Sequence, residues 1–70
     1  MLTLKLIRDG AITILETPSV KVVPKDGGGK RVLAQAIDSM AEDEYVVGEG
    51  EYDTAYVENA RGSTVQTVKP

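Results

Sequence analysis

Residues 24–33 read PKDGGGKRVL and are the part of the chain that most resembles a ligand-binding loop. A phosphate-binding loop of the form G-x-x-x-x-G-K-[ST] uses glycine amides and a lysine to hold the phosphates, and a hydroxyl to hold magnesium. Gly29 and Lys30 match the last glycine and the lysine. Pro24 stands in place of the first glycine, however, and Arg31 in place of the hydroxyl. A nucleotide or other cofactor is therefore not expected here.

The same stretch is better explained as a turn between two strands. Glycine adopts backbone conformations with positive φ without steric cost, so a run of three glycines suits the connection between VKVV and RVLAQAI. Lys25, Lys30 and Arg31 would then lie at an exposed hairpin tip. We regard these three side chains as candidates for weak contact with an anion.

Acidic side chains dominate the second half of the chain. Residues 32–60 hold eight acidic side chains and no basic one, whereas residues 1–31 hold six basic and three acidic ones. Folding either preserves this asymmetry, which favours self-association or a basic partner, or it interleaves the two halves and cancels it. The candidate interaction residues are in the acidic half: Glu49, Glu51, Asp53, Glu58, Tyr52 and Tyr56.

The side chains that carry most catalytic and metal chemistry are missing. The chain has no His and no Cys, which removes the commonest general base, thiol nucleophiles and soft-metal ligands. Paired carboxylates would need a sugar-sized cleft, which a 70-residue chain rarely forms. The acidic stretch AEDEYVVGEGEYD lacks the ligand spacing of a calcium loop. We therefore expect no enzyme and no catalytic or metal-binding residue.

Nucleic-acid binding is a weaker alternative. Small β domains that bind single-stranded nucleic acid stack the bases on aromatic side chains and hold the phosphates in a basic groove. Here the pI is about 4.7, and Tyr52 and Tyr56 are interleaved with acids that repel phosphate. Binding would have to use the basic half of the chain, including Lys21. Tyr45 and Tyr56 are instead expected to cover the edge of the core.

The N-terminal segment MLTLKLIRDG does not resemble a secretory signal. It contains Lys5 and Arg8 and lacks an apolar core of about 7–15 residues. No stretch approaches the roughly 20 apolar residues of a membrane-spanning helix. The sequence therefore predicts a cytoplasmic protein without a membrane segment.

The first sixteen residues predict a β-hairpin. LTLKLI alternates leucine with Thr3 and Lys5, the period of a half-buried strand, and AITILE follows Arg8-Asp9-Gly10. A three-residue loop at 8–10 would place Leu6 opposite Ile12, Leu4 opposite Ile14 and Leu2 opposite Glu16, with the apolar side chains on one face. A two-residue Asp-Gly loop would scatter them, so we expect the three-residue loop.

Further strands are expected along the chain. Thr17-Pro18-Ser19 is expected to interrupt the second strand, because proline cannot donate a backbone hydrogen bond to a β ladder. The segment VKVVP is expected to continue the strand after this interruption. EYVVG indicates a short strand before the bend Gly48-Glu49-Gly50. A final hairpin with its loop at 60–62 would pair Asn59 with Ser63 and Val57 with Val65.

Residues 30–44 leave two folds open. Leu33, Ala36, Ile37 and Met40 have helical spacing, but a helix would carry basic residues at its positive end and acids at its negative end. We favour a strand over 31–37, followed by a helical turn that Asp38 or Ser39 begins. The predicted fold is a single mainly β domain over residues 1–70, an antiparallel meander or barrel-like arrangement of about five strands with at most one short helix. The alternative is α+β, with a helix at about 31–43.

The expected function follows from the small size of the hydrophobic core that so short a chain can form. A chain of this length buries only about 60% of the surface that its unfolded form exposes. Disulfides are excluded, and so are the usual zinc ligands, which leaves association as the common remaining support. We expect a non-catalytic structural or protein-interaction module that forms a homo-oligomer. The alternatives are an acidic surface that binds or inhibits a basic protein, and a weak nucleic-acid binder.

Overall fold

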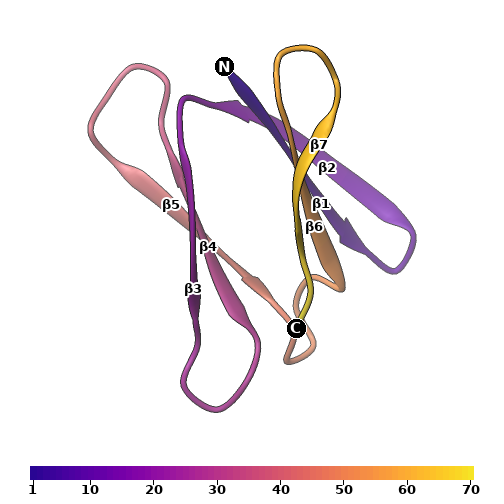
Figure 1. Ribbon diagram of the computed structural model, residues 1–70. Helices are drawn as coiled ribbons and strands as arrows, with labels where there is room; N and C mark the ends of the chain where they lie inside the picture. The colour runs from indigo at the N-terminus through magenta and orange to yellow at the C-terminus, as the bar shows by residue number, and fades with distance from the viewer.

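The computed structural model describes all 70 residues and contains seven strands and no helix (Figure 1). The strands are β1 (Leu2–Arg8), β2 (Ala11–Thr17), β3 (Val20–Pro24), β4 (Lys30–Gln35), β5 (Glu42–Val47), β6 (Thr54–Glu58) and β7 (Thr64–Val68). They form a four-stranded sheet in the order β2-β1-β6-β7 and a three-stranded sheet in the order β3-β4-β5. All neighbours are antiparallel. The predicted mainly β class is confirmed, with seven strands in place of about five.

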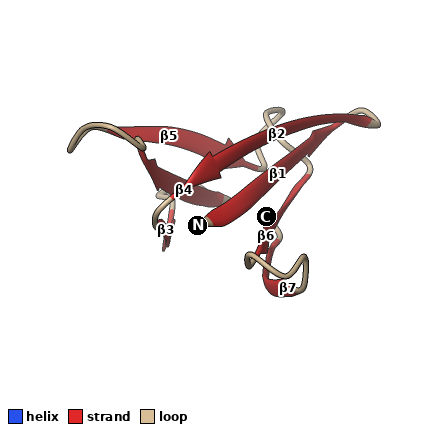
Figure 2. Ribbon diagram, turned by 90° about the horizontal axis from the view of Figure 1, so that it is seen from above, coloured by secondary structure: helices blue, strands red, loops and turns tan.

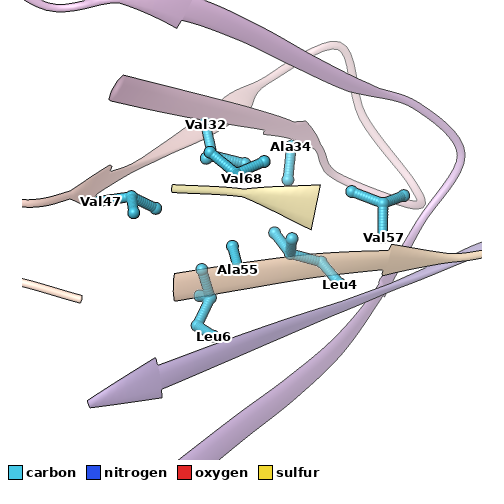
Figure 3. Packing of buried hydrophobic residues seen from close by; sticks show 8 residues of the cluster. All are labelled: Leu4, Leu6, Val32, Ala34, Val47, Ala55, Val57 and Val68. Carbon is cyan, nitrogen blue, oxygen red and sulfur yellow. The ribbon is translucent and has the colours of Figure 1, made fainter. Parts of the chain in front are cut away.

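The two sheets enclose one small hydrophobic core. In Figure 2, β3, β4 and β5 lie to one side and β1, β6 and β7 to the other. Side chains from both sheets point into the space between them, and none of the buried apolar ones is larger than leucine (Figure 3). The eight buried hydrophobic residues are Leu4, Leu6, Val32, Ala34, Val47, Ala55, Val57 and Val68. A core of this size gives the domain little apolar burial, as expected for so short a chain.

The first hairpin differs from the predicted register. Arg8 pairs with Ala11 and Leu6 with Thr13, so the loop has two residues, Asp9 and Gly10. Asp9 has φ of 50° and Gly10 of 80°. Positive φ at both central residues is the geometry of a type I′ turn, whose twist matches the flanking strands and for which Asp-Gly is a preferred sequence. The predicted three-residue loop is wrong because the turn chemistry outweighs the apolar alternation.

The corrected register changes which side chains of β2 are buried. Leu4 and Leu6 are fully buried, as predicted, but Ile12 and Ile14 point to the opposite face and are 57% and 61% exposed. The inner face of β2 instead carries Leu15, which packs against the core. The outer face of the four-stranded sheet therefore carries two exposed isoleucines. The predicted pairing of Leu2 with Glu16 fails for the same reason, because Leu2 pairs with Thr17.

Residues 30–35 form a central strand, and the alternative of a helix at 31–43 is wrong. β4 pairs with β3 on one side and with β5 on the other. Val32 and Ala34 lie two residues apart on the same face of β4, and both are buried. A strand also avoids the unfavourable charges that a helix over these residues would carry at its two ends. The helical turn expected at Asp38 or Ser39 does not form either. Residues 36–41 make a turn in which Ala36 N–H donates to the Ala41 carbonyl.

The other predicted breaks and turns are largely confirmed. β3 follows the interruption at 18–19 and pairs with β4 through the glycine-rich connection. In the last hairpin, Asn59 N–H donates to the Ser63 carbonyl at 2.9 Å, as the 60–62 loop requires. Val57, however, pairs with Gln66 and not with Val65, because the ladder has a bulge between Val57 and Glu58. The extra residue of a bulge shifts the pairing by one position.

Candidate functional site

The glycine-rich tip is closed by contacts within the chain. Gly28 N–H donates to the Lys25 carbonyl, and Lys25 N–H donates to the Gly29 carbonyl, both at 3.1 Å. The Lys25 side chain reaches across to Glu49, with its Nζ 2.7 Å from Oε2. The structure thus brings one candidate anion contact together with one candidate acidic residue. The tip is a structured turn with its own counter-ion.

The two other basic candidates differ from each other. Arg31 lies beside Glu44, with Nε 3.7 Å from Oε2, whereas Lys30 makes no ion pair. Partly exposed ion pairs of this kind contribute about 0–1 kcal/mol each. Two of the three charges proposed for weak anion contact are therefore already balanced by carboxylates. This arrangement weakens the nucleic-acid alternative.

Two of the candidate acids also contact other parts of the chain. Glu58 Oε2 lies 3.0 Å from Lys5 Nζ. Asp53 Oδ2 accepts a hydrogen bond from the backbone N–H of Asp9 at 2.9 Å, and so holds the β1–β2 turn. Glu51 is exposed and makes no ion pair. Of the four acids proposed for an acidic interaction surface, Glu51 is therefore the one whose carboxylate has no partner within the chain.

The ion pairs follow one pattern across the molecule. Each of the three joins a base from residues 1–31 to an acid from residues 32–60. Folding therefore interleaves the two oppositely charged halves of the sequence. Of the two outcomes expected for the charge asymmetry, these ion pairs follow the one in which folding interleaves the two halves.

The tyrosines lie in two different environments. The rings of Tyr45 and Tyr52 meet edge to face, with centroids 6.2 Å apart and an interplanar angle of 71°. Both pack against the core. Tyr56 lies between the buried Ala55 and Val57 on β6, so its side chain points to the outer face of the four-stranded sheet. The expectation that Tyr56 covers the core is wrong, and Tyr52 takes that place beside Tyr45.

The environment of Tyr45 predicts a loss of stability in alkaline solution. Burial, and then the nearby Asp43 carboxylate and Tyr52, raise the pKa of the Tyr45 phenol above its ordinary value of 10.0. The folded protein holds the phenolic proton more tightly than the unfolded chain, so this contribution is present below about pH 10 and is lost as the pH rises through the folded-state pKa. Urea midpoints measured from pH 8 to 11 are expected to fall less steeply for Tyr45→Phe. Parallel pH profiles of the two proteins would contradict this prediction.

Thr17 is a structural residue that no pattern in the sequence reveals. It is the one buried polar residue, and its hydroxyl oxygen lies 2.8 Å from the Ser19 carbonyl and 2.7 Å from the Gln35 carbonyl. These contacts join β2 of one sheet to the end of β4 in the other. The partner carbonyls are distant in sequence or outside the strand, which explains why periodicity alone does not reveal the link.

Replacement of Thr17 by valine tests that link. Thr17→Val keeps the shape of the side chain but removes the hydroxyl, so we expect the free energy of unfolding to fall by about 1–3 kcal/mol. Thr67→Val is the matched control because Thr67 is an exposed strand threonine on β7, at the opposite edge of the sheet from β2. Its effect is expected to be within about 0.5 kcal/mol. Chemical denaturation measures both, and equal effects would rule out a bridging role for the Thr17 hydroxyl.

An apolar surface lies on the outer face of the sheet at β1 and β2. Ile7 pairs with Ile12, and Ile14 is two residues further along β2 on the same side. We call Ile7, Ile12 and Ile14 the isoleucine surface. Ile12 and Ile14 have more than half of their area in contact with solvent. Sequence periodicity missed this surface because β2 is apolar on both faces, and the turn type decides which face is buried.

No pocket and no cluster of three or more potential metal ligands is present in the structure. None of its elements is a helix that is long and apolar enough to cross a membrane. Comparison with known proteins finds no matching family model, no matching curated protein and no matching solved structure.

Proposed function

We propose that this chain is a non-catalytic interaction module that associates with itself. The observation that carries the proposal is the isoleucine surface. Ile12 and Ile14 are adjacent on one face of β2 and are 57% and 61% exposed. Strand isoleucines of a monomeric domain are normally among the most buried residues. A neighbouring pair in water on a regular strand favours a surface that another molecule covers.

The size of the core supports the same proposal. Eight buried apolar side chains, none larger than leucine, stabilise a chain that has no disulfide. Complete burial of an isoleucine contributes about 1.5–3 kcal/mol. Covering about half of the exposed parts of Ile12 and Ile14 would add about 1–2 kcal/mol per protomer. Proteins have a stability of about 0.05–0.15 kcal/mol per residue, which is about 4–10 kcal/mol for a domain of this length. The contribution from the two isoleucines is a large fraction of that total.

Light scattering after size-exclusion chromatography tests self-association directly. The molar mass is expected to rise above that of the 7.5 kDa chain as the protein concentration increases from micromolar to millimolar. The unfolding midpoint is expected to rise over the same range, because association stabilises the folded state by mass action. A constant monomer mass up to millimolar concentration would end the proposal.

A further inference from the structure

β2 is an edge strand with an unpaired side. Its one partner in the sheet is β1. Alternate residues of an antiparallel strand direct their backbone N–H and C=O groups to opposite sides, so half of those on β2 point to the free edge. Residues 11–14 are exposed on both faces, and Figure 1 shows the β1–β2 hairpin extending away from the three-stranded sheet. This edge is therefore accessible to another strand.

The other three edges carry features that oppose strand addition. β3 contains Lys21 and ends at Pro24, which has no backbone N–H. β5 begins with three consecutive acids, Glu42 to Glu44. The ladder between β6 and β7 is interrupted by a bulge. Lysine, proline, charge and bulges are the usual means by which proteins protect sheet edges. Residues 11–15 of β2, AITIL, contain none of them.

We infer that β2 pairs antiparallel with β2 of a second copy of this chain, about a two-fold axis at Thr13. This inference rests on the self-association proposed above and names the surface that forms it. In this register Ile12 lies beside Ile14 of the partner subunit, and Ile14 beside Ile12 of the partner subunit. The two four-stranded sheets join into one continuous eight-stranded sheet. A two-fold contact of this kind is closed and leaves no β2 edge free.

The side chains of β2 select a second copy as the occupant. The register places isoleucine beside isoleucine on the outer face, and β-branched cross-strand pairs are favourable in sheets. Glu16, the one charged residue of β2, would lie opposite Gly10 of the partner subunit. The two Glu16 carboxylates would then be about 20 Å apart along the strands, too far to repel strongly. A strand from another protein would satisfy the same backbone groups, but residues 11–15 carry no charge that would select it.

Ile12→Lys is the decisive variant, with Val65→Lys as its matched control. Both positions are 57% exposed in β strands, but Val65 is on β7, at the opposite edge of the sheet. Ile12→Lys removes both symmetric pairs between position 12 of one protomer and Ile14 of the other. It also places one positive charge from each protomer at the interface between the two strands. We expect the dimer dissociation constant to rise about 30-fold or more. Val65→Lys is expected to leave it within about threefold, since a surface substitution away from a contact changes little. Circular dichroism and cooperative unfolding check that both variants are folded.

Hydrogen exchange distinguishes edge pairing from side-chain stacking. Pairing through β2 is expected to slow amide exchange within residues 11–16 as the protein concentration rises, and Ile12→Lys is expected to abolish that change. A dimer whose β2 amides exchange equally fast at all concentrations, or one that survives Ile12→Lys, would overturn the edge inference and leave self-association standing. A wild-type chain that remains monomeric would overturn both.

Discussion

Replacing Gly29 with alanine is expected to lower the free energy of unfolding by about 2–5 kcal/mol. Gly29 has φ of +83°, and a Cβ atom added to it would lie 2.6 Å from the carbonyl oxygen of Val47. The left-handed conformation costs a residue with a side chain about 1–2 kcal/mol, and overpacking adds about 1–3 kcal/mol. The obstructing atom is backbone of β5, which cannot rotate away. A domain of this length has a total stability of only about 4–10 kcal/mol, so the variant loses a large fraction of it.

Gly62→Ala is the matched control for this prediction. Gly62 has φ of +84°, and an added Cβ would meet no atom within 4 Å. It therefore isolates the conformational cost of about 1–2 kcal/mol from the steric one. Urea denaturation of both variants, compared at equal protein concentration, gives the two losses. Equal losses would contradict the close approach of Gly29 to β5.

The contact at Gly29 also gives the glycine run a structural role. Lys30, the next residue, pairs with Val47, so the connection must pass directly over the end of β5. A side chain at Gly29 would prevent that passage. The sequence correctly predicts a turn between two strands here, because glycine composition is a local signal. The contacts with Glu49 and Val47 are separated from the turn by about twenty residues, and no local pattern could reveal them.

The first hairpin shows where local signals conflict. Alternating leucines identify β1, and their burial at Leu4 and Leu6 is confirmed. β2 has apolar residues on both faces, and the hydrophobic pattern alone favours the three-residue loop because it collects Ile12 and Ile14 on the face of the leucines. The preference of Asp9-Gly10 for a two-residue turn overrides that pattern, and Asp53, just before β6, reinforces the turn by accepting a hydrogen bond from Asp9 N–H. The exposed position of Ile12 and Ile14 follows from that choice and was not predictable from periodicity.

The candidate acids illustrate a different limit. Their composition indicates an interaction surface, but the positions of their partners depend on the complete fold. Glu49 and Glu58 meet lysines from the other half of the chain. A count of charges along the sequence cannot distinguish paired carboxylates from free ones. The register of the β1–β2 hairpin, by contrast, depends on a local choice between a two-residue and a three-residue loop. Two substitutions in this hairpin can test that choice.

Leu6→Ala and Ile12→Ala are expected to have very different effects on stability. In the three-residue register these side chains lie opposite each other on one buried face, whereas in the structure Leu6 is fully buried and Ile12 is 57% exposed. Leu6→Ala is expected to cost about 2–5 kcal/mol, because it removes buried methyl groups and leaves a cavity. Ile12→Ala is expected to cost less than about 1 kcal/mol in the monomer, since more than half of its surface is already in water. The comparison requires a protein concentration at which light scattering gives the mass of one chain, so that loss of association does not contribute. Similar losses at the two positions would favour the three-residue loop and remove the isoleucine surface on which the proposed dimer depends.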